Sequence, residues 1–424
     1  MTMSRRAFLS LGGAAVAAGA AGAITGPAAW RELVHHHVQE ARSDTTPTTA
    51  DPPGASPGPR VLVVIDLGGG NDGLNTLVPA DGRYRDARPT LAVPESSLVA
   101  LPGTTAYGLN PALRPLEEWW ADGSLVAVNG LAIPDQTRSH FLASDVWWTA
   151  QPGSPHGTGW LGRWLDEQHD VTNPLRAISL GLANQALVGR VALPTVVADP
   201  RTFALLAPPG ADADTLTGAF LATAHPASSE PVLRASQLAV PDAVAAVRTL
   251  TPALGTQDDD GADTSSADIT VTDLLGVAAG IIDLRIGTQV LMVSVTGFDT
   301  HADQAARHPE LLADLARGLD AFLAEMRARG RADEVLVVTT SEFGRRVEEN
   351  GSGTDHGQAS VQFLAGAEVA GGRVVGTADL AHLDDGDLPL RIDTRSVYAA
   401  ALDWLGGPTD DILGAKYDRL GLLH

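Results

Sequence analysis

The sequence of 424 residues has no cysteine, a single lysine (Lys416) and few aromatic residues, which make up 5% of the chain. Without cysteine the protein forms no disulfide bond, holds no iron–sulfur cluster through thiolates and uses no thiol nucleophile. Cations are scarce as well, because 29 basic residues face 51 acidic ones and the formal net charge is −22. We therefore expect neither nucleic acid nor an anionic membrane surface as a partner, since both are bound through clustered cations.

The N-terminal segment, residues 1–29, is typical of an export signal. It begins with Arg5 and Arg6 and continues with a weakly apolar run rich in alanine and glycine. Paired arginines before such a run indicate the twin-arginine pathway. We therefore expect the twin-arginine export machinery as a partner, and the periplasm, the cell envelope or the medium as the destination. An uncleaved membrane helix is the alternative, although the run barely reaches the roughly 18 apolar residues that a span needs.

The next segment, residues 30–59, is polar and rich in proline, and we predict a disordered linker there. Its three consecutive histidines, His35, His36 and His37, could capture a metal ion adventitiously. Residues 60–424 are numerous enough for one large domain or two ordinary ones. We predict one α/β domain, with a partly helical insertion at about residues 199–268.

The fold class follows from the alternation of apolar runs and amphipathic segments. Residues 61–65, 124–133, 288–301 and 333–342 are strand-like, and the apolar runs lack the polar alternation of a half-exposed sheet. Residues 110–123, 139–150, 270–284 and 309–330 have helical spacing, with Leu311, Leu315 and Leu319 marking one face of the last. Strands that alternate with helices predict a mainly parallel central sheet flanked by helices.

Acidic and imidazole side chains follow several of these strands. Asp66 ends the first, Asp299 and His301 end a later one, and Glu342 ends the next. Asp355 and His356 lie in the loop beyond Glu342, so the loop's glycines would let it return both to the same edge of the sheet. Ligands of open α/β sheets bind at the carboxyl ends of the strands. A mixture of carboxylates and imidazoles suits a divalent cation, either zinc, magnesium, calcium or manganese.

Other roles stay open for these residues. Asp66 could cap the glycine turn that follows it, and Glu342 could pair with Arg345 or Arg346. Asp299 and His301 share a face only if the strand continues that far. The glycines at 68–70 lack the lysine of a phosphate-binding P-loop and the spacing of a dinucleotide fingerprint, so we expect no nucleotide site.

Six longer motifs carry a family resemblance. They are "LGGGNDGLNTLVP", "RSHFLASDVWW", "GWLGRWLD", "GFDTHADQ", "SEFGRRVEENGSGTDHG" and "GGRVVG". The chain from about residue 60 onward resembles the bacterial twin-arginine-exported family of domain of unknown function 1501. That family is grouped with the alkaline phosphatase and sulfatase superfamily. The resemblance implies an alkaline phosphatase-like α/β sandwich with metal ions at the strand ends.

The resemblance also implies roles for single residues. Asp66 matches the aspartate that binds one metal at the end of the first strand, and Asp299 with His301 resembles the pair that holds the other. Glu342 stands at the aspartate of an Asp-His pair, and His356 is similar to the last histidine ligand. The expected metal ligands are thus Asp66, Asp299, His301, Glu342, Asp355 and His356.

At the catalytic positions the resemblance leaves more than one candidate residue. Ser139, before a helix, resembles the serine or threonine nucleophile, with Ser144 as an alternative, and the adjacent His140 is a second catalytic candidate. Phe343 departs from the superfamily, because it stands where the paired histidine would be. Arg138, Arg345 and Arg346 are candidates for holding a tetrahedral anion, because guanidinium groups fit such anions well.

Two functions are compatible with these residues. The first is an exported, metal-dependent hydrolase of phosphate or sulfate esters, acting on a small or polymeric anionic substrate. The alternative is a non-catalytic protein of the cell envelope that keeps the fold and binds a polymer or another protein.

Overall fold

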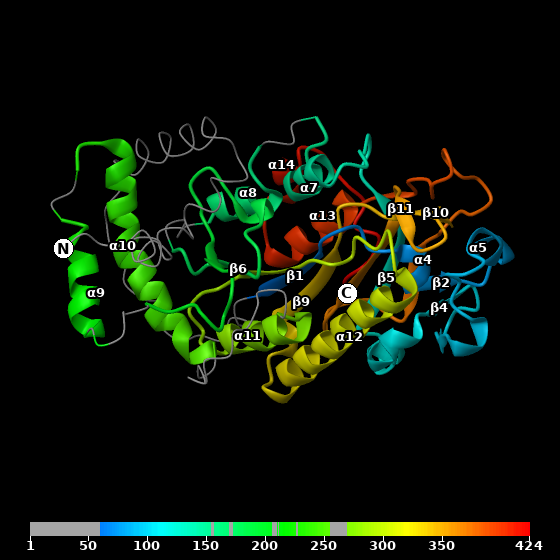
Figure 1. Ribbon diagram of the computed structural model, residues 1–424, viewed down its shortest axis with the longest axis horizontal. Coiled ribbons are helices and arrows are strands. Elements are labelled where there is room, and N and C mark those ends of the chain that lie inside the picture. Colours follow the sequence, from blue (N-terminus) through cyan, green and yellow to red (C-terminus); the bar gives the residue numbers. More distant parts are fainter. Residues whose placement is uncertain are drawn as a thin grey trace.

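The computed structural model of the protein (Figure 1) describes residues 60–153, 157–168, 173–205, 210, 212–225, 228–254 and 269–424. The predicted signal at 1–29, the predicted linker at 30–59 and residues 255–268 of the predicted insertion lie outside the described residues. Within the described ranges, no helix is both long enough and apolar enough to cross a membrane.

A nine-stranded sheet forms the centre of the molecule. Its strands follow the spatial order β13-β5-β12-β9-β1-β8-β6-β7, and β14 pairs with β5. Their bounds are β1 (Val61–Leu67), β5 (Leu125–Ala132), β6 (Ala177–Leu180), β7 (Thr195–Val197), β8 (Val290–Val295), β9 (Val335–Thr340), β12 (Ser360–Ala365), β13 (Arg373–Gly376) and β14 (Ile392–Asp393).

The predicted mainly parallel sheet is confirmed. Only β12 runs antiparallel to its neighbours β5 and β9, and the other pairs of this sheet are parallel. The exception has a local cause: the chain leaves β9 through the hairpin β10 (Arg345–Glu349) and β11 (Thr354–His356) instead of a crossover helix. A strand that returns without a crossover must run antiparallel.

Helices cover both faces of the sheet, as Figure 1 shows above and below it. Val63 and Ile65 of β1 pack in the core cluster that includes α11 (Val271–Asp283), α12 (Gln304–Ala328), η2 (Pro111–Leu116) and α6 (Glu117–Ala121). Leu62 and Val64 face the cluster of α7 (His140–Thr149), α8 (Trp160–Asp166), α13 (Arg395–Leu405) and α14 (Thr409–Leu413). Alternate residues of β1 are therefore buried on opposite faces, which explains its continuous apolar run.

Two sequence predictions need correction. Residues 110–123 form the 3₁₀ helix η2 and the short helix α6 rather than one helix, because Pro115 lies inside the segment and donates no backbone hydrogen bond. The strand expected to reach His301 ends at Val295 in β8. Gly297 then adopts a φ of 112°, which stops the extended run, so Asp299 and His301 lie in a loop.

The remaining elements lie outside the main sheet. Between β7 and α11 the described residues form α9 (Ala213–Ala222), α10 (Pro231–Leu250) and η4 (Thr251–Ala253), and Figure 1 shows α9 and α10 projecting to one side. A second small sheet follows the first strand and is joined by short helices. These elements are α4 (Gly73–Thr76), β2 (Leu77–Pro79), α5 (Gly82–Ala87), η1 (Glu95–Ser97), β3 (Val99–Ala100) and β4 (Tyr107–Leu109), while η3 (Gln185–Leu187) and η6 (Ala332–Glu334) are single turns elsewhere.

Candidate metal centre

The candidate site lies at the carboxyl edge of the sheet. Strand β1 pairs with β8 on one side and with β9 on the other, and all three run in the same direction. The loops after β8 and β9 therefore carry Asp299, His301 and Glu342 to one edge. His140 joins them as the first residue of α7, which follows the parallel strand β5.

The glycine-rich turn after β1 binds the carboxylate of Glu342. The backbone N–H of Gly69 lies 2.8 and 3.1 Å from the two carboxylate oxygens, and that of Gly70 lies 3.2 Å from Oε2. Both glycines have positive φ, 120° and 83°, and successive N–H groups in such a turn form an anion-binding nest. Because Glu342 occupies this nest, the turn is not available to a phosphate group.

Each of three histidines is fixed through its Nδ1 atom. His140 Nδ1 lies 2.8 Å from Glu342 Oε1, and His301 Nδ1 lies 3.0 Å from Asp355 Oδ1. His356 Nδ1 lies 2.7 Å from the backbone carbonyl oxygen of Arg138. A carbonyl or ionised carboxylate only accepts hydrogen bonds, so we assign the proton of each neutral ring to Nδ1. The lone pair of each ring is then on Nε2.

The three Nε2 atoms converge on Asp299. His301 Nε2 and His356 Nε2 each lie 3.2 Å from Asp299 Oδ1, and His140 Nε2 lies 3.4 Å from Oδ2. The Nε2 atoms of His301 and His356 are only 2.8 Å apart. The ligand atoms of His140, Asp299 and His356 all lie within 4.8 Å of one another, a group that could hold a metal ion. Nitrogen-rich donors of this kind suit zinc and related ions.

The charges at the centre are set by hydrogen bonds as well as by burial. Burial acts to raise the pKa of Asp299, but the hydrogen bond and positive charge of Arg345, together with the neighbouring imidazoles, outweigh it and hold that pKa at about 2. The hydrogen bond to Glu342 raises the pKa of His140, whereas burial lowers the pKa of His356. Asp299 is therefore an anion at any ordinary pH and a suitable partner for a cation.

The phenyl ring of Phe343 packs against the rings of His140 and His356. Its side chain is fully buried, and its ring centroid lies 4.9 Å from that of His140 and 4.5 Å from that of His356. A Cβ atom on Gly70 would come within 2.3 Å of the Phe343 ring, which explains the glycine there. The position at which the resemblance implied a histidine therefore serves as a packing surface.

Asp66 lies apart from the imidazole group. It is buried on β1, and its Oδ2 accepts a hydrogen bond of 2.8 Å from the Asn184 side chain. Burial, together with the nearby charge of Glu342, raises the pKa of Asp66 to about 7. The structure thus brings together five of the six expected ligands, Asp299, His301, Glu342, Asp355 and His356, and leaves Asp66 next to Glu342.

The two catalytic candidates occupy the start of α7. Ser139 is the N-cap residue, but its hydroxyl makes no capping bond and no other hydrogen bond among the described residues. The alternative, Ser144, lies about one turn further along the helix. His140 was expected as a catalytic group, and its ring belongs to the group that could hold a metal ion. The sequence contained the necessary signal, because His140 follows a strand that ends at the same edge.

The arginines near the site are already paired. The Arg138 guanidinium donates to Asp387 Oδ2 at 3.2 and 2.5 Å, and Arg346 lies 3.6 Å from Asp387 Oδ1. Arg345 is fully buried and bonds to Asp299 at 2.7 Å. These contacts assign Arg138 and Arg346 to the loop around Asp387 rather than to a bound anion.

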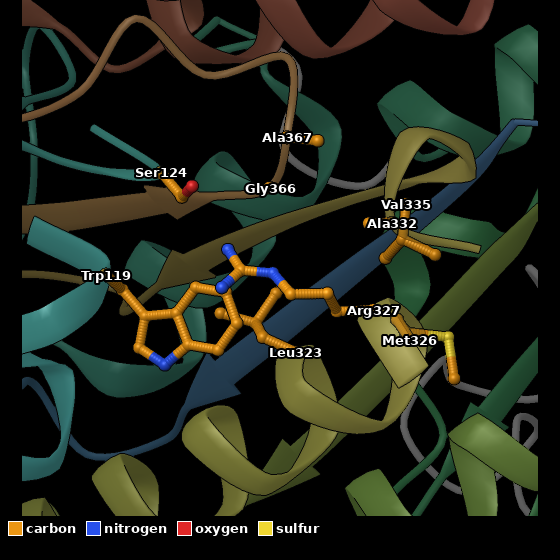
Figure 2. A pocket seen from close by; sticks show the side chains of 9 residues that line it. All are labelled: Trp119, Ser124, Leu323, Met326, Arg327, Ala332, Val335, Gly366 and Ala367. Carbon is orange, nitrogen blue, oxygen red and sulfur yellow. The ribbon is translucent and has the colours of Figure 1, made fainter. Parts of the chain in front are cut away.

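A small pocket at the opposite edge is separate from this centre (Figure 2). It has a volume of about 50 Å³ and includes Val335, the first residue of β9, and Gly366, which follows β12. The Arg327 guanidinium lies over the Trp119 ring there, 4.2 Å from its centroid.

Comparison with known protein families confirms the resemblance found in the motifs. The model of a family described as Protein of unknown function (DUF1501) matches residues 211–406, which is less than half of the chain. The matched segment includes His301, Glu342 and His356. The motifs around Asp66 and His140 precede it. A search among curated proteins gives no match.

Several solved structures share a weak likeness with the chain. A protein in the alkaline phosphatase superfamily from Vibrio parahaemolyticus has 10% identity and a TM-score of 0.38, covering 89% of this chain and 75% of that chain. A sulfatase from a Pseudoalteromonas species has 10% identity and a TM-score of 0.36, covering 94% and 76%. A phosphonate monoester hydrolase from Silicibacter pomeroyi has 9% identity and a TM-score of 0.36, covering 86% and 76%. At TM-scores this low, the likeness carries no argument about this chain.

Proposed function

We propose that this protein is an exported, metal-dependent hydrolase of phosphate or sulfate esters. One observation carries the proposal: three imidazole rings, each fixed at Nδ1 by an oxygen acceptor, direct Nε2 toward the carboxylate of Asp299. Two lone pairs 2.8 Å apart, on His301 and His356, repel each other unless a cation lies between or beside them. Metal-binding histidines typically show this arrangement, in which the second ring nitrogen donates to an oxygen.

The donor set suits one kind of ion better than the others. His140, His301, His356 and Asp299 would hold the ion through three nitrogen atoms and one carboxylate. Zinc and related ions accept such ligands, whereas magnesium and calcium prefer oxygen. Glu342 and Asp355 would then orient the rings of His140 and His301 instead of binding the ion. A divalent ion at this place would polarise a phosphoryl or sulfuryl oxygen as a Lewis acid.

Ser139 is the proposed nucleophile. It immediately precedes His140, so its hydroxyl belongs to the same helix start as a proposed ligand. In the proposed reaction the Ser139 oxygen attacks phosphorus or sulfur, the bond to the alcohol oxygen breaks, and the proton of the Ser139 hydroxyl passes to the departing alcohol. Water then cleaves the seryl ester, which releases phosphate or sulfate and restores the hydroxyl group.

A non-catalytic binding protein with one structural metal ion is the second candidate. The observation that favours it is the pairing of Arg138 and Arg346 with Asp387, which leaves neither guanidinium directed at a bound anion. Phe343 favours it as well, because a buried phenyl ring contributes no ligand.

Activity assays separate the two candidates. We expect protein purified without an affinity tag to contain zinc or a similar ion and to hydrolyse a generic phosphate or sulfate monoester. His356→Ala and Ser139→Ala should each lower the rate by at least about 100-fold, the scale on which an essential catalytic group contributes. His225→Ala, at an exposed histidine, is the matched control. A metal-loaded protein with no activity would favour the binding role, and a fully active His356→Ala variant would contradict the hydrolase proposal.

A further inference from the structure

The side chain of Arg345 fills an oxygen-lined space beside Asp299. Its side chain is 0% exposed. Nε lies 2.7 Å from the carbonyl oxygen of Gly70, and Nη1 lies 2.8 Å from that of Thr354. Nη2 lies 2.9 Å from the carbonyl oxygen of Phe298 and 2.7 Å from Asp299 Oδ1, and it also contacts the Gly69 carbonyl.

These acceptors would themselves make a cation site. Four backbone carbonyl oxygens and one carboxylate oxygen surround the guanidinium, and such oxygen sets are what hard cations such as calcium prefer. The guanidinium keeps its charge at any pH at which the protein is folded. A permanent organic cation therefore occupies the place where a second metal ion could bind Asp299.

The partners of Asp299 differ in their exposure. The side chain of Arg345 is fully buried, while the side chains of His140 and His301 are 33% and 40% exposed. The backbone of Arg345 also pairs with that of His356 across the β10–β11 hairpin. The hairpin thus brings a buried cation and a histidine to the same oxygen of Asp299, Oδ1.

We infer that the centre binds one metal ion per chain, on the imidazole side of Asp299, and that Arg345 replaces a second ion. This inference rests on the proposed metal centre. A second divalent ion near Asp299 would have to displace a buried guanidinium with five contacts, or lie close to its positive charge. The ion that binds is of the zinc type, because the oxygen set that suits calcium is filled.

A metal titration of the full-length chain tests the inference. The protein should carry His35→Ala, His36→Ala and His37→Ala, so that the N-terminal histidines do not contribute binding. Cobalt(II) absorption spectra and zinc titration calorimetry should both end at one equivalent. An excess of calcium should neither compete nor add a binding step. His356→Ala, checked for folding by circular dichroism, should no longer bind the one equivalent of metal ion.

The possible results are distinguishable. Two equivalents lost in His356→Ala, or a calcium site alongside the zinc site, would overturn the single-ion inference and leave the proposed metal centre standing. No bound ion at all would overturn the inference and the metal centre together.

Discussion

In the proposed centre, Glu342 would act through His140 rather than by binding the ion. Its carboxylate is held by the Gly69 and Gly70 amides and accepts from His140 Nδ1 at 2.8 Å. Glu342→Gln should therefore lower zinc affinity by about 10- to 100-fold, which is the usual cost of losing a side chain that hydrogen-bonds to a metal ligand. Competitive titration with a chelator measures this, and Glu310→Gln on the exposed face of α12 is the control. Equal affinities of Glu342→Gln and wild type would contradict the assigned role.

Asp66 should make stability depend on pH. Its pKa rises from 3.8 to about 7 on folding, mainly through burial. Between these two values the folded state binds more protons than the unfolded state, so raising the pH through this window destabilises the fold. Asp66→Asn removes the effect, and its stability relative to wild type should increase by on the order of a few kcal/mol from about pH 4 to about pH 8.

Urea denaturation of the metal-free protein at both pH values measures this difference. Asp86→Asn, at an exposed aspartate of α5, should show little pH-dependent change relative to wild type. If the difference between Asp66→Asn and wild type did not vary with pH, Asp66 would not be protonated in the fold.

The residue types at the centre could be predicted from the sequence, but their contacts could not. Acids and histidines after apolar runs indicated a cation site at one edge of the sheet. Nothing in the order of residues shows that Glu342 meets a histidine Nδ1, or that Arg345 bonds to the glycine turn, because these contacts join residues 202 and 275 positions apart.

At the scale of elements, Arg88 ties α5 to the β10 strand. Its guanidinium pairs with Asp72 at 2.6 Å, with both side chains buried, and donates to the carbonyl oxygens of Val347 and Arg346. Arg88→Leu leaves Asp72 as an unpaired buried charge, which should cost about 3–5 kcal/mol of stability. Chemical denaturation measures the loss.

A surface ion pair between α5 and η1 is the control for Arg88. Arg85 lies 3.4 Å from Glu95, but the two side chains are 43% and 69% exposed. Arg85→Leu should therefore change stability by less than about 1 kcal/mol. Equal losses in Arg85→Leu and Arg88→Leu would contradict the assignment of a buried, structural pair.

Element types were more predictable than element ends. Buried apolar runs and the amphipathic pattern of α12 identified most strands and long helices, because burial on one or two faces determines these patterns. The end of β8 depends on the backbone of Gly297, and the antiparallel direction of β12 depends on a hairpin. Neither is encoded in hydrophobic spacing.

At the scale of the whole molecule, the export proposal depends on Arg5 and Arg6, which lie outside the described residues. Arg5→Lys combined with Arg6→Lys should keep the protein in the cytoplasm, because lysine does not reproduce the planar guanidinium pair that the signal requires. Cell fractionation with antibody detection measures this. Arg42→Lys, in the predicted linker, should leave export unchanged. Normal export of the double variant would contradict the twin-arginine assignment.

The central claim is that three imidazoles and Asp299 surround a metal ion. Anomalous diffraction from crystals of the zinc-loaded protein, recorded on both sides of the zinc absorption edge, tests it most directly. The account predicts one strong zinc peak among the Nε2 atoms of His140, His301 and His356 and the carboxylate of Asp299. Absence of zinc at this place, with the three rings and Asp299 well ordered, would contradict it.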